Sequence, residues 1–168
     1  MKELEIKTLG APILREKAME IQTVTKEVYE LIRNMFFTMY ADDKGVGLAA
    51  PQVGEGVRII VVDLTPDHRS PIVFINPQLL EPKDEEVQVE ECLSVPGVKV
   101  PVKRATSIVV AFVNEVGKPL KIQAQGLMAR VIQHEIDHLD GKLIIDYLSD
   151  AEKEKICPDS STERTPVS

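Results

Sequence analysis

The sequence predicts an α+β fold in which mainly antiparallel β-sheets surround a central helix that carries an HExxH motif. Three observations support this: a long amphipathic segment near the start, strand-like patterns through the middle, and a second helical segment followed by a short third one. The 168 residues contain no internal repeat and no linker-like stretch, which suits one domain. We expect that domain to span residues 1–156, with a flexible Ser/Thr/Pro-rich tail over 157–168.

Helical periodicity predicts the first helix, a long one from about Thr25 to Tyr40. Apolar residues recur there at spacings of three and four, which indicates one buried face, and Thr25 suits an N-cap. Polar residues at 42–45 end this helix. We expect a loop of small residues over 45–54 to follow it.

The middle of the chain predicts β-strands. The nearly continuous apolar run at 57–64 is typical of a buried strand, and a short strand at 72–75 should stop at Asn76-Pro77. Alternation at 86–90 predicts a half-buried strand, while Pro101 confines a strand at 98–102 to an edge or bulge. Residues 108–113 and 120–124 predict a hairpin across a turn at 114–118.

Helical spacing returns over about 127–140, with Gly126 before it and Gly141 placed as the residue that ends it. We expect a short strand over 143–148. The run from Ser149 to Glu152 is a capping box, which predicts a short C-terminal helix.

Charge and composition exclude several classes of protein. The chain has 20 Lys+Arg against 27 Asp+Glu, a net charge of −7, so we expect no nucleic-acid partner and no anionic membrane surface as partner. It shows neither a signal peptide nor an apolar run near the roughly 18 residues that cross a membrane. Two cysteines cannot form a disulfide framework. These features predict a soluble cytoplasmic protein.

The segment from His134 to His138 carries the strongest local signal. Its two histidines are four apart, so on a helix both imidazoles lie on one face and can bind one metal ion. Glu135 follows the first histidine and is placed to act as general base and then general acid. The alternative is a charged helical turn with two surface histidines.

A catalytic metal site of this kind needs a third protein ligand and one open position. Cys92 directly follows the alternating strand, and its thiolate is a strong ligand for zinc or ferrous iron; the alternative is a small buried apolar residue. His68 lies in a polar turn and Cys157 near the terminus, so we expect both to be bystanders.

The segment 45–54 is the third part of the predicted active site. Gly45 and Gly47 permit close approach of a ligand backbone, and the side-chain amide of Gln52 is the type of donor that stabilises an oxyanion. Taken alone, this segment is weak evidence.

Three segments occur in order at spacings that resemble the peptide deformylase family. They are Gly45-Val-Gly-Leu-Ala-Ala-Pro-Gln52, Glu90-Glu-Cys-Leu-Ser94 and Gln133-His-Glu-Ile-Asp-His-Leu-Asp-Gly141, matching GxGxAAxQ, EGCLS and HExDH. The resemblance runs from residue 10 to residue 149. HExxH alone occurs in many unrelated metalloproteases, whereas the three motifs together are highly specific.

The resemblance implies one divalent metal, physiologically Fe(II), with zinc, nickel or cobalt as substitutes. It assigns the metal to Cys92, His134 and His138, and the catalytic acid/base role to Glu135. The implied activity is removal of the N-formyl group from formylmethionyl nascent peptides, with release of formate. Work in proximity to the ribosome is compatible with this activity.

The resemblance also implies roles in substrate binding. Gln52 and the backbone N–H of Leu93 would stabilise the oxyanion. Val46 and Gly47 match positions that line the methionine pocket and pair with the substrate backbone, and Glu90 matches a residue beside that pocket.

One residue departs from the family's pattern: Glu91 stands where the motif has Gly. If that Gly serves a positive φ, Glu91 would strain the strand end that presents Cys92; if the side chain faces solvent, the change is harmless. A third alternative is that a carboxylate near the metal disfavours an anionic product or raises the pKa of metal-bound water. We expect a working site with shifted kinetics at most.

Two other functions compete. A zinc endopeptidase would use the same HExxH helix, but the Gly/Ala-rich segment and a Cys ligand argue against it. A non-catalytic module with a structural metal would need a closed fourth position, for which no Cys or His is well placed except the distant His68 or Cys157.

Overall fold

The structure, a computed structural model, describes residues 1–156; the predicted tail over 157–168, with Cys157, lies outside the described residues. Within 1–156, five strands form one antiparallel sheet in the order β1-β2-β3-β4-β5. The helices and strands are η1 (Pro12–Arg15), α1 (Lys26–Tyr40), β1 (Gly47–Ala49), η2 (Ala50–Val53), β2 (Ile59–Val62), β3 (Ile72–Cys92), β4 (Val95–Val113), β5 (Pro119–Gln125), α2 (Gly126–Leu139), η3 (Ile144–Tyr147) and α3 (Asp150–Ile156).

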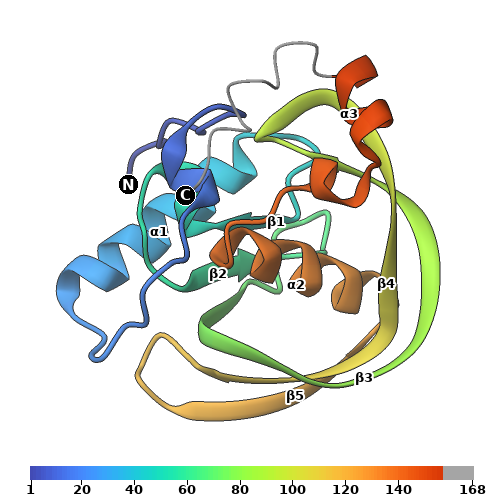
Figure 1. The fold of residues 1–168 in the computed structure, drawn as a ribbon. Helices are drawn as coiled ribbons and strands as arrows, with labels where there is room; N and C mark the ends of the chain where they lie inside the picture. Colours follow the sequence, from blue (N-terminus) through green and yellow to red (C-terminus); the bar gives the residue numbers. More distant parts are fainter. Residues whose placement is uncertain (157–168) are drawn as a thin grey trace.

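The α+β prediction is confirmed, with the HExxH helix α2 at the centre. Figure 1 shows the long strands β3 and β4 curving around α2, while α1 lies beside β1 and β2. Register shifts interrupt the β3–β4 ladder between Ile75 and Gln78, between Leu80 and Lys83, and between Glu90 and Cys92. Such bulges bend and twist a strand, which lets the sheet curl around one helix.

Both long helices agree with prediction. Thr25 is the N-cap of α1 and its Oγ1 accepts a hydrogen bond from the N–H of Val28, 3.3 Å away. Gly141 has φ +75° just after α2, as expected of a helix-ending glycine. The predicted β4–β5 hairpin and the capping box at Ser149 are also present. Among residues 1–156, no helix has the length and apolar character to cross a membrane.

The loop predicted over 45–54 is wrong for most of its length. Residues 47–49 form β1, in which Gly47 pairs with Val62, and residues 50–53 form η2. Leu48 and Ala49 are fully buried. The apolar edge of β2 provides a partner strand, and this distant pairing overrides the local preference of small residues for loops.

The strand predicted over 72–75 does not stop at Asn76-Pro77. It continues as β3 to Cys92, because Asn76 takes φ +50° at a bulge and the pairing with β4 resumes at Gln78.

The prediction of a half-buried strand over 86–90 is also wrong, because the side chains expected to be buried are exposed: Val87 is 56% exposed and Val89 is 63% exposed. Around Pro101, β4 pairs with β3 on one side and has no partner strand among residues 1–156 on the other. The prediction that Pro101 lies in an edge strand is therefore confirmed.

The short strand predicted over 143–148 is wrong, because residues 144–147 form the 3₁₀ helix η3. The Asp146 carboxylate accepts the N–H of Leu143 at 3.0 Å and so stabilises the turn. No other strand of the described chain pairs with this segment.

Buried apolar residues form three clusters. The first fills the space between the sheet and α2, and the second lies between α1 and strands β1 and β2. The third gathers η1, η3 and the start of β4 around Cys92. The end of β3 is therefore fixed by packing against η1, η3 and the start of β4.

Candidate metal centre

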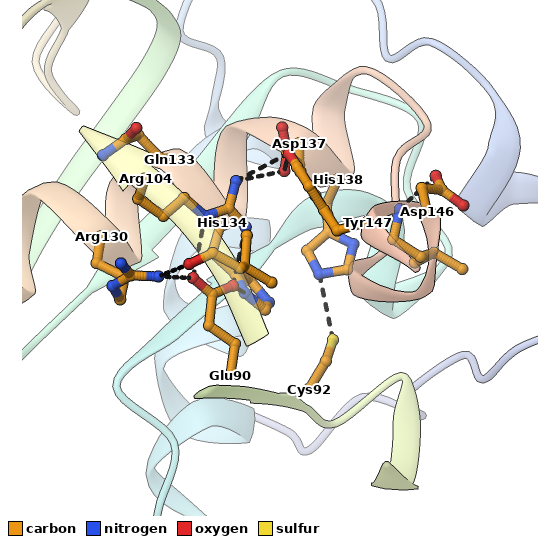
Figure 2. Close-up of polar contacts among 12 residues, drawn as sticks. Glu90, Cys92, Arg104, Arg130, Gln133, His134, Asp137, His138, Asp146 and Tyr147 are labelled. Atoms are coloured by element: carbon orange, nitrogen blue, oxygen red, sulfur yellow. Dashed lines mark hydrogen bonds and ion pairs between the residues drawn. The ribbon is translucent and has the colours of Figure 1, made fainter. Parts of the chain in front are cut away.

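The structure brings together the three predicted metal ligands. Cys92 is the last residue of β3, and His134 and His138 lie one turn apart on α2. Their ligand atoms lie within 4.8 Å of one another, and Cys92 Sγ is 3.3 Å from His138 Nε2. Figure 2 shows the Cys92 side chain pointing at His138 from the strand below the helix.

The electrostatics of this cluster favour a cation. Burial lowers the pKa of His134, but hydrogen bonds with Cys92 and Glu90 and the charge of Glu135 raise it to about 10. A positive charge is therefore stabilised at this position. Burial holds the pKa of His138 well below its ordinary value, so its imidazole is neutral, the form that binds metal. One thiolate and two imidazoles are a donor set that suits zinc or Fe(II). The residues fit a divalent metal.

Glu135 is buried between α2 and β1, with 5% of its surface exposed. Its Oε2 has no hydrogen-bond partner among residues 1–156. Burial raises the pKa of Glu135 to about 7. A carboxyl group with such a pKa can both accept and release a proton near neutral pH.

Gly47 makes room for this carboxylate. A Cβ at residue 47 would lie 2.9 Å from Glu135 Oε1 and 2.8 Å from Val131 Cγ1. Contacts that short require one of the partners to move. The second glycine of the GxGxAAxQ segment is therefore a packing requirement of the site.

Gln52 is held in one orientation. Its Oε1 accepts the N–H of Ala49 at 2.9 Å, and its Nε2 donates to Ser94 Oγ at 3.2 Å. The same Nε2 lies 3.7 Å from Cys92 Sγ. The amide N–H groups of Gln52 are thus directed toward the metal-ligand cluster.

A cavity of about 120 Å³ opens beside these groups. It is bounded by segment 44–47 and Gln52 on one side, by residues 91–93 at the end of β3, and by α2. The lining residues are Lys44, Gly45, Val46, Gly47, Gln52, Glu91, Cys92, Leu93, Arg130, Val131, His134 and Glu135.

Glu90, predicted beside the substrate pocket, does not line this cavity. Its Oε1 lies 2.8 Å from His134 Nδ1, and both of its oxygens accept hydrogen bonds from Arg104. Arg130 Nη1 donates to Oε2 at 2.6 Å. Burial would raise the pKa of Glu90, but its bonds to His134 and Arg104 lower it to about 2. The carboxylate is thus ionised. Figure 2 shows it next to His134 and in contact with Arg130.

Sequence reasoning missed the rest of this network. Arg104 Nη1 also donates to Asp137 Oδ2 at 2.6 Å, and the Tyr147 hydroxyl lies 2.5 Å from the same oxygen. Asp137, inside the HExDH motif, was a signal for it. Arg104 and Arg130 gave none, because an arginine on a strand or helix is usually exposed.

Glu91 is not strained. Positive φ values at described non-glycine residues occur at His68, Asn76, Glu81 and Asp84, and Glu91 is not among them. Its side chain is 56% exposed. The strain alternative is therefore wrong and the side chain faces solvent, while the effect of Glu91 on activity stays a prediction.

His68 stays away from the cluster. It is exposed and contacts Tyr40, with the two rings tilted by 41° and their centroids 4.0 Å apart. Within residues 1–156, Cys92, His134 and His138 form the one group of three or more His, Cys, Asp or Glu ligand atoms that could hold a metal. A closed site with a fourth Cys or His is thus absent from the described chain, which argues against a structural metal.

Comparisons with known proteins agree with this geometry. A family profile described as polypeptide deformylase matches residues 3–154. The peptide deformylase of Dictyoglomus thermophilum is 54% identical over 142 residues, covering 84% of this chain and 90% of that protein. The crystal structure of the Legionella pneumophila enzyme superposes with a TM-score of 0.89 at 38% identity, covering 96% and 95% of the two chains.

The Met-Ala-Ser-bound crystal structure of the Acinetobacter baumannii enzyme gives a TM-score of 0.82 at 32% identity, covering 87% of this chain and 98% of that one. The profile match extends over β3 and α2, the strand and the helix that meet at the metal-ligand cluster. The chain therefore belongs to the polypeptide deformylase family, the metallohydrolases that remove the N-formyl group from nascent polypeptides.

Proposed function

We propose that this chain acts on the N-terminal formylmethionine of nascent polypeptides and releases formate, using one divalent metal held by Cys92, His134 and His138. One observation carries this proposal. The sulfur of Cys92 and two imidazoles converge beside a cavity that also holds Glu135, a buried carboxyl group with one oxygen that has no hydrogen-bond partner among residues 1–156.

We propose Fe(II) as the physiological metal, with zinc, nickel and cobalt as substitutes, because thiolate and imidazole ligands accept all four. Bound there, the metal would act as a Lewis acid on the formyl carbonyl and lower the pKa of water at the site. Glu90 positions His134: a carboxylate only accepts hydrogen bonds, so Nδ1 carries the proton and Nε2 remains for the metal.

Glu135 is proposed as the catalytic acid and base. Its free Oε2 accepts a proton from the attacking water and then delivers it to the leaving amine nitrogen. The pKa of about 7 suits both transfers at neutral pH.

Gln52 and the N–H of Leu93 are proposed to stabilise the oxyanion. Both residues line the cavity next to Cys92, and the bond from Ala49 to Gln52 Oε1 fixes the amide so that its N–H groups donate toward the site. A donor already held in place needs no reorganisation as charge develops.

Val46 and Gly47 are proposed to contact the formylmethionyl residue, since both line the cavity and Gly47 carries no side chain that would close it. The Met-Ala-Ser in the Acinetobacter baumannii structure has the free methionine that deformylation produces, which supports this substrate class. We further propose that residues 1–156 form one catalytic domain and that the enzyme works in the cytoplasm close to the ribosome.

The test is formate release from formyl-Met-Ala-Ser by protein loaded anaerobically with Fe(II), and separately with zinc, nickel or cobalt. We expect release that a chelator abolishes and added metal restores. Glu135→Gln should lower kcat by about 10²–10⁴-fold while metal analysis still finds one ion per chain. Mass spectrometry of the same reactions detects internal cleavage. Metal-loaded protein that releases no formate, or that cuts internal bonds instead, would contradict the proposal.

A further inference from the structure

Two opposite charges flank the mouth of the cavity. Among the residues that line it, Lys44 and Glu91 are the exposed ones, and the others are buried or half-buried. The exposed members of a cavity lining mark where it opens to solvent. A substrate that enters the cavity therefore passes Lys44 and Glu91.

The Glu91 carboxylate is available for a ligand. Within residues 1–156 its charged partner is Lys99, whose Nζ is 4.0 Å from Glu91 Oε1, and the two side chains are 72% and 56% exposed. A pair this long and this exposed contributes little and exchanges readily with another cation.

The position of Glu91 is well defined. It lies between Glu90 and Cys92, both of which are held by buried contacts, and it precedes the metal ligand by one residue. Its Cα is thus fixed relative to the reacting group although its carboxylate faces solvent. Lys44, by contrast, lies in the turn after α1, and its ammonium group is carried at the end of a long flexible side chain.

A formylated peptide brings no charge at its N-terminus, because the formyl group blocks the amine. Its carbonyl must reach the Cys92–His134–His138 cluster, so the residues after the methionine leave through the mouth. Each extended residue advances about 3.3 Å, so the residues that directly follow the methionine are the ones that come closest to the mouth, where Glu91 lines the cavity.

We propose that Glu91 is a specificity-determining residue that favours substrates with Lys or Arg at position two or three and disfavours Asp or Glu there. This inference rests on the proposed function. The charge is this chain's own addition, since the motif that the second segment resembles has a glycine at this position.

The expected preference is modest. An exposed ion pair changes an equilibrium by about two- to five-fold, and salt weakens it. The contact is equally present in the ground state and the transition state, so it lowers KM and leaves kcat nearly the same.

The experiment measures kcat and KM of the metal-loaded enzyme on formyl-Met-Xaa-Ser and formyl-Met-Ala-Xaa, with Lys, Gln or Glu as Xaa, at low and high salt. Wild type should process the Lys peptide of at least one series with a kcat/KM about two- to five-fold above the Gln peptide, through KM, and the Glu peptide below it. Glu91→Gln should remove this order, and Glu91→Lys should reverse it.

Glu85→Gln is the matched control. Glu85 is 66% exposed, lies on the same strand and faces Lys103 at 3.8 Å, but it does not line the cavity. It should keep the wild-type order. Equal kcat/KM for the Lys, Gln and Glu peptides at both positions, or an order that persists in Glu91→Gln, would overturn this inference alone. Absence of formate from every peptide, the neutral ones included, would overturn the proposed function and this inference with it.

Discussion

Glu90 serves the site without reaching the cavity. Its carboxylate accepts hydrogen bonds from Arg104 and Arg130 and holds His134 Nδ1 at 2.8 Å, while residues 91–93 provide the cavity wall. It is the link between a metal ligand on α2 and the strand β4 that carries Arg104. Residues that orient metal ligands affect metal binding nearly as strongly as the ligands do.

Replacing Glu90 by Gln should weaken metal affinity about 10–100-fold, because the amide no longer fixes the His134 ring as a charged acceptor. It should also lower the free energy of unfolding by about 3–5 kcal/mol, since the buried guanidinium of Arg130 loses its carboxylate partner and that of Arg104 keeps Asp137 as its remaining one. Metal titration and urea unfolding measure the two effects. Glu86→Gln, an exposed change on the same strand, should stay within about 0.5 kcal/mol of wild type. Equal effects of the two variants would refute this role.

Gly47→Ala should lower activity and stability through the steric clash of the added methyl group. The new Cβ would lie within 3 Å of Glu135 Oε1 and Val131 Cγ1, so β1 or the carboxylate must shift. We expect a cost of about 1–3 kcal/mol in stability, and a shift of about 1 Å at the carboxylate corresponds to roughly a 100-fold loss of kcat. Gly56→Ala is the control, because a Cβ there meets no atom within 4 Å. Wild-type kinetics in Gly47→Ala would show that the position tolerates a side chain.

The segments around β2 show how distant elements fix the cavity wall. Asp63 follows β2, and its N–H donates to Val46 O at 2.9 Å, just before β1. Its carboxylate accepts the N–H of Thr65 at 2.9 Å and the hydroxyl of Tyr40 at 2.8 Å. Asp63 thus connects α1 with the end of β2 through its carboxylate, and reaches the segment that lines the cavity through its backbone N–H.

This connection should depend on pH. Burial would raise the pKa of Asp63, but hydrogen bonds from Thr65 and Tyr40 lower it below its ordinary value of about 3.9. A depressed folded-state pKa means that the stabilisation is complete above about pH 4 and is lost as pH falls through the folded-state pKa. The difference in unfolding free energy between wild type and Asp63→Asn should therefore be constant from pH 7 to 5 and shrink below 4. Urea unfolding across this range measures it, and a difference that grows on acidification would contradict the prediction.

Local patterns predicted the elements that local interactions stabilise. The stripe and cap of α1, the glycine that ends α2 and the capping box before α3 all depend on residues within one or two turns. The failures share a different cause. Partners far along the chain decided that β1 forms and that β3 continues through Asn76. The lack of a partner strand within the described chain decided that η3 is a helical turn.

At the scale of the whole molecule, two separately packed regions meet at the metal-ligand cluster. Cys92 belongs to the apolar cluster around η1 and η3, while the two histidines project from α2, which packs on the sheet. A metal held by all three would connect these packing units. It would bind the folded state in preference to the unfolded one.

Metal removal should therefore lower the melting temperature. At a free metal concentration 100 times Kd, binding contributes about 2.7 kcal/mol, and a chain of this size shifts by about 2–4 °C per kcal/mol. We expect a fall of roughly 5–10 °C on chelation, measured by calorimetry. His138→Ala should show a much smaller difference between metal-loaded and chelated samples. Equal melting temperatures for loaded and stripped wild type would argue against a metal that spans the two elements.

The sequence by itself determined the chemistry that the chain can offer. The spacing of His134 and His138, the scarcity of other Cys and His, and the order of three motifs identified the ligand candidates and the family before any contact was known. Only the tertiary structure decided which groups support them. Arg104 and Arg130 come to Glu90 from β4 and α2, and Glu91 meets the cavity mouth, because the long strands curl around one helix. Periodicity reports which face of an element is buried, whereas these roles depend on distances between elements, which packing alone sets.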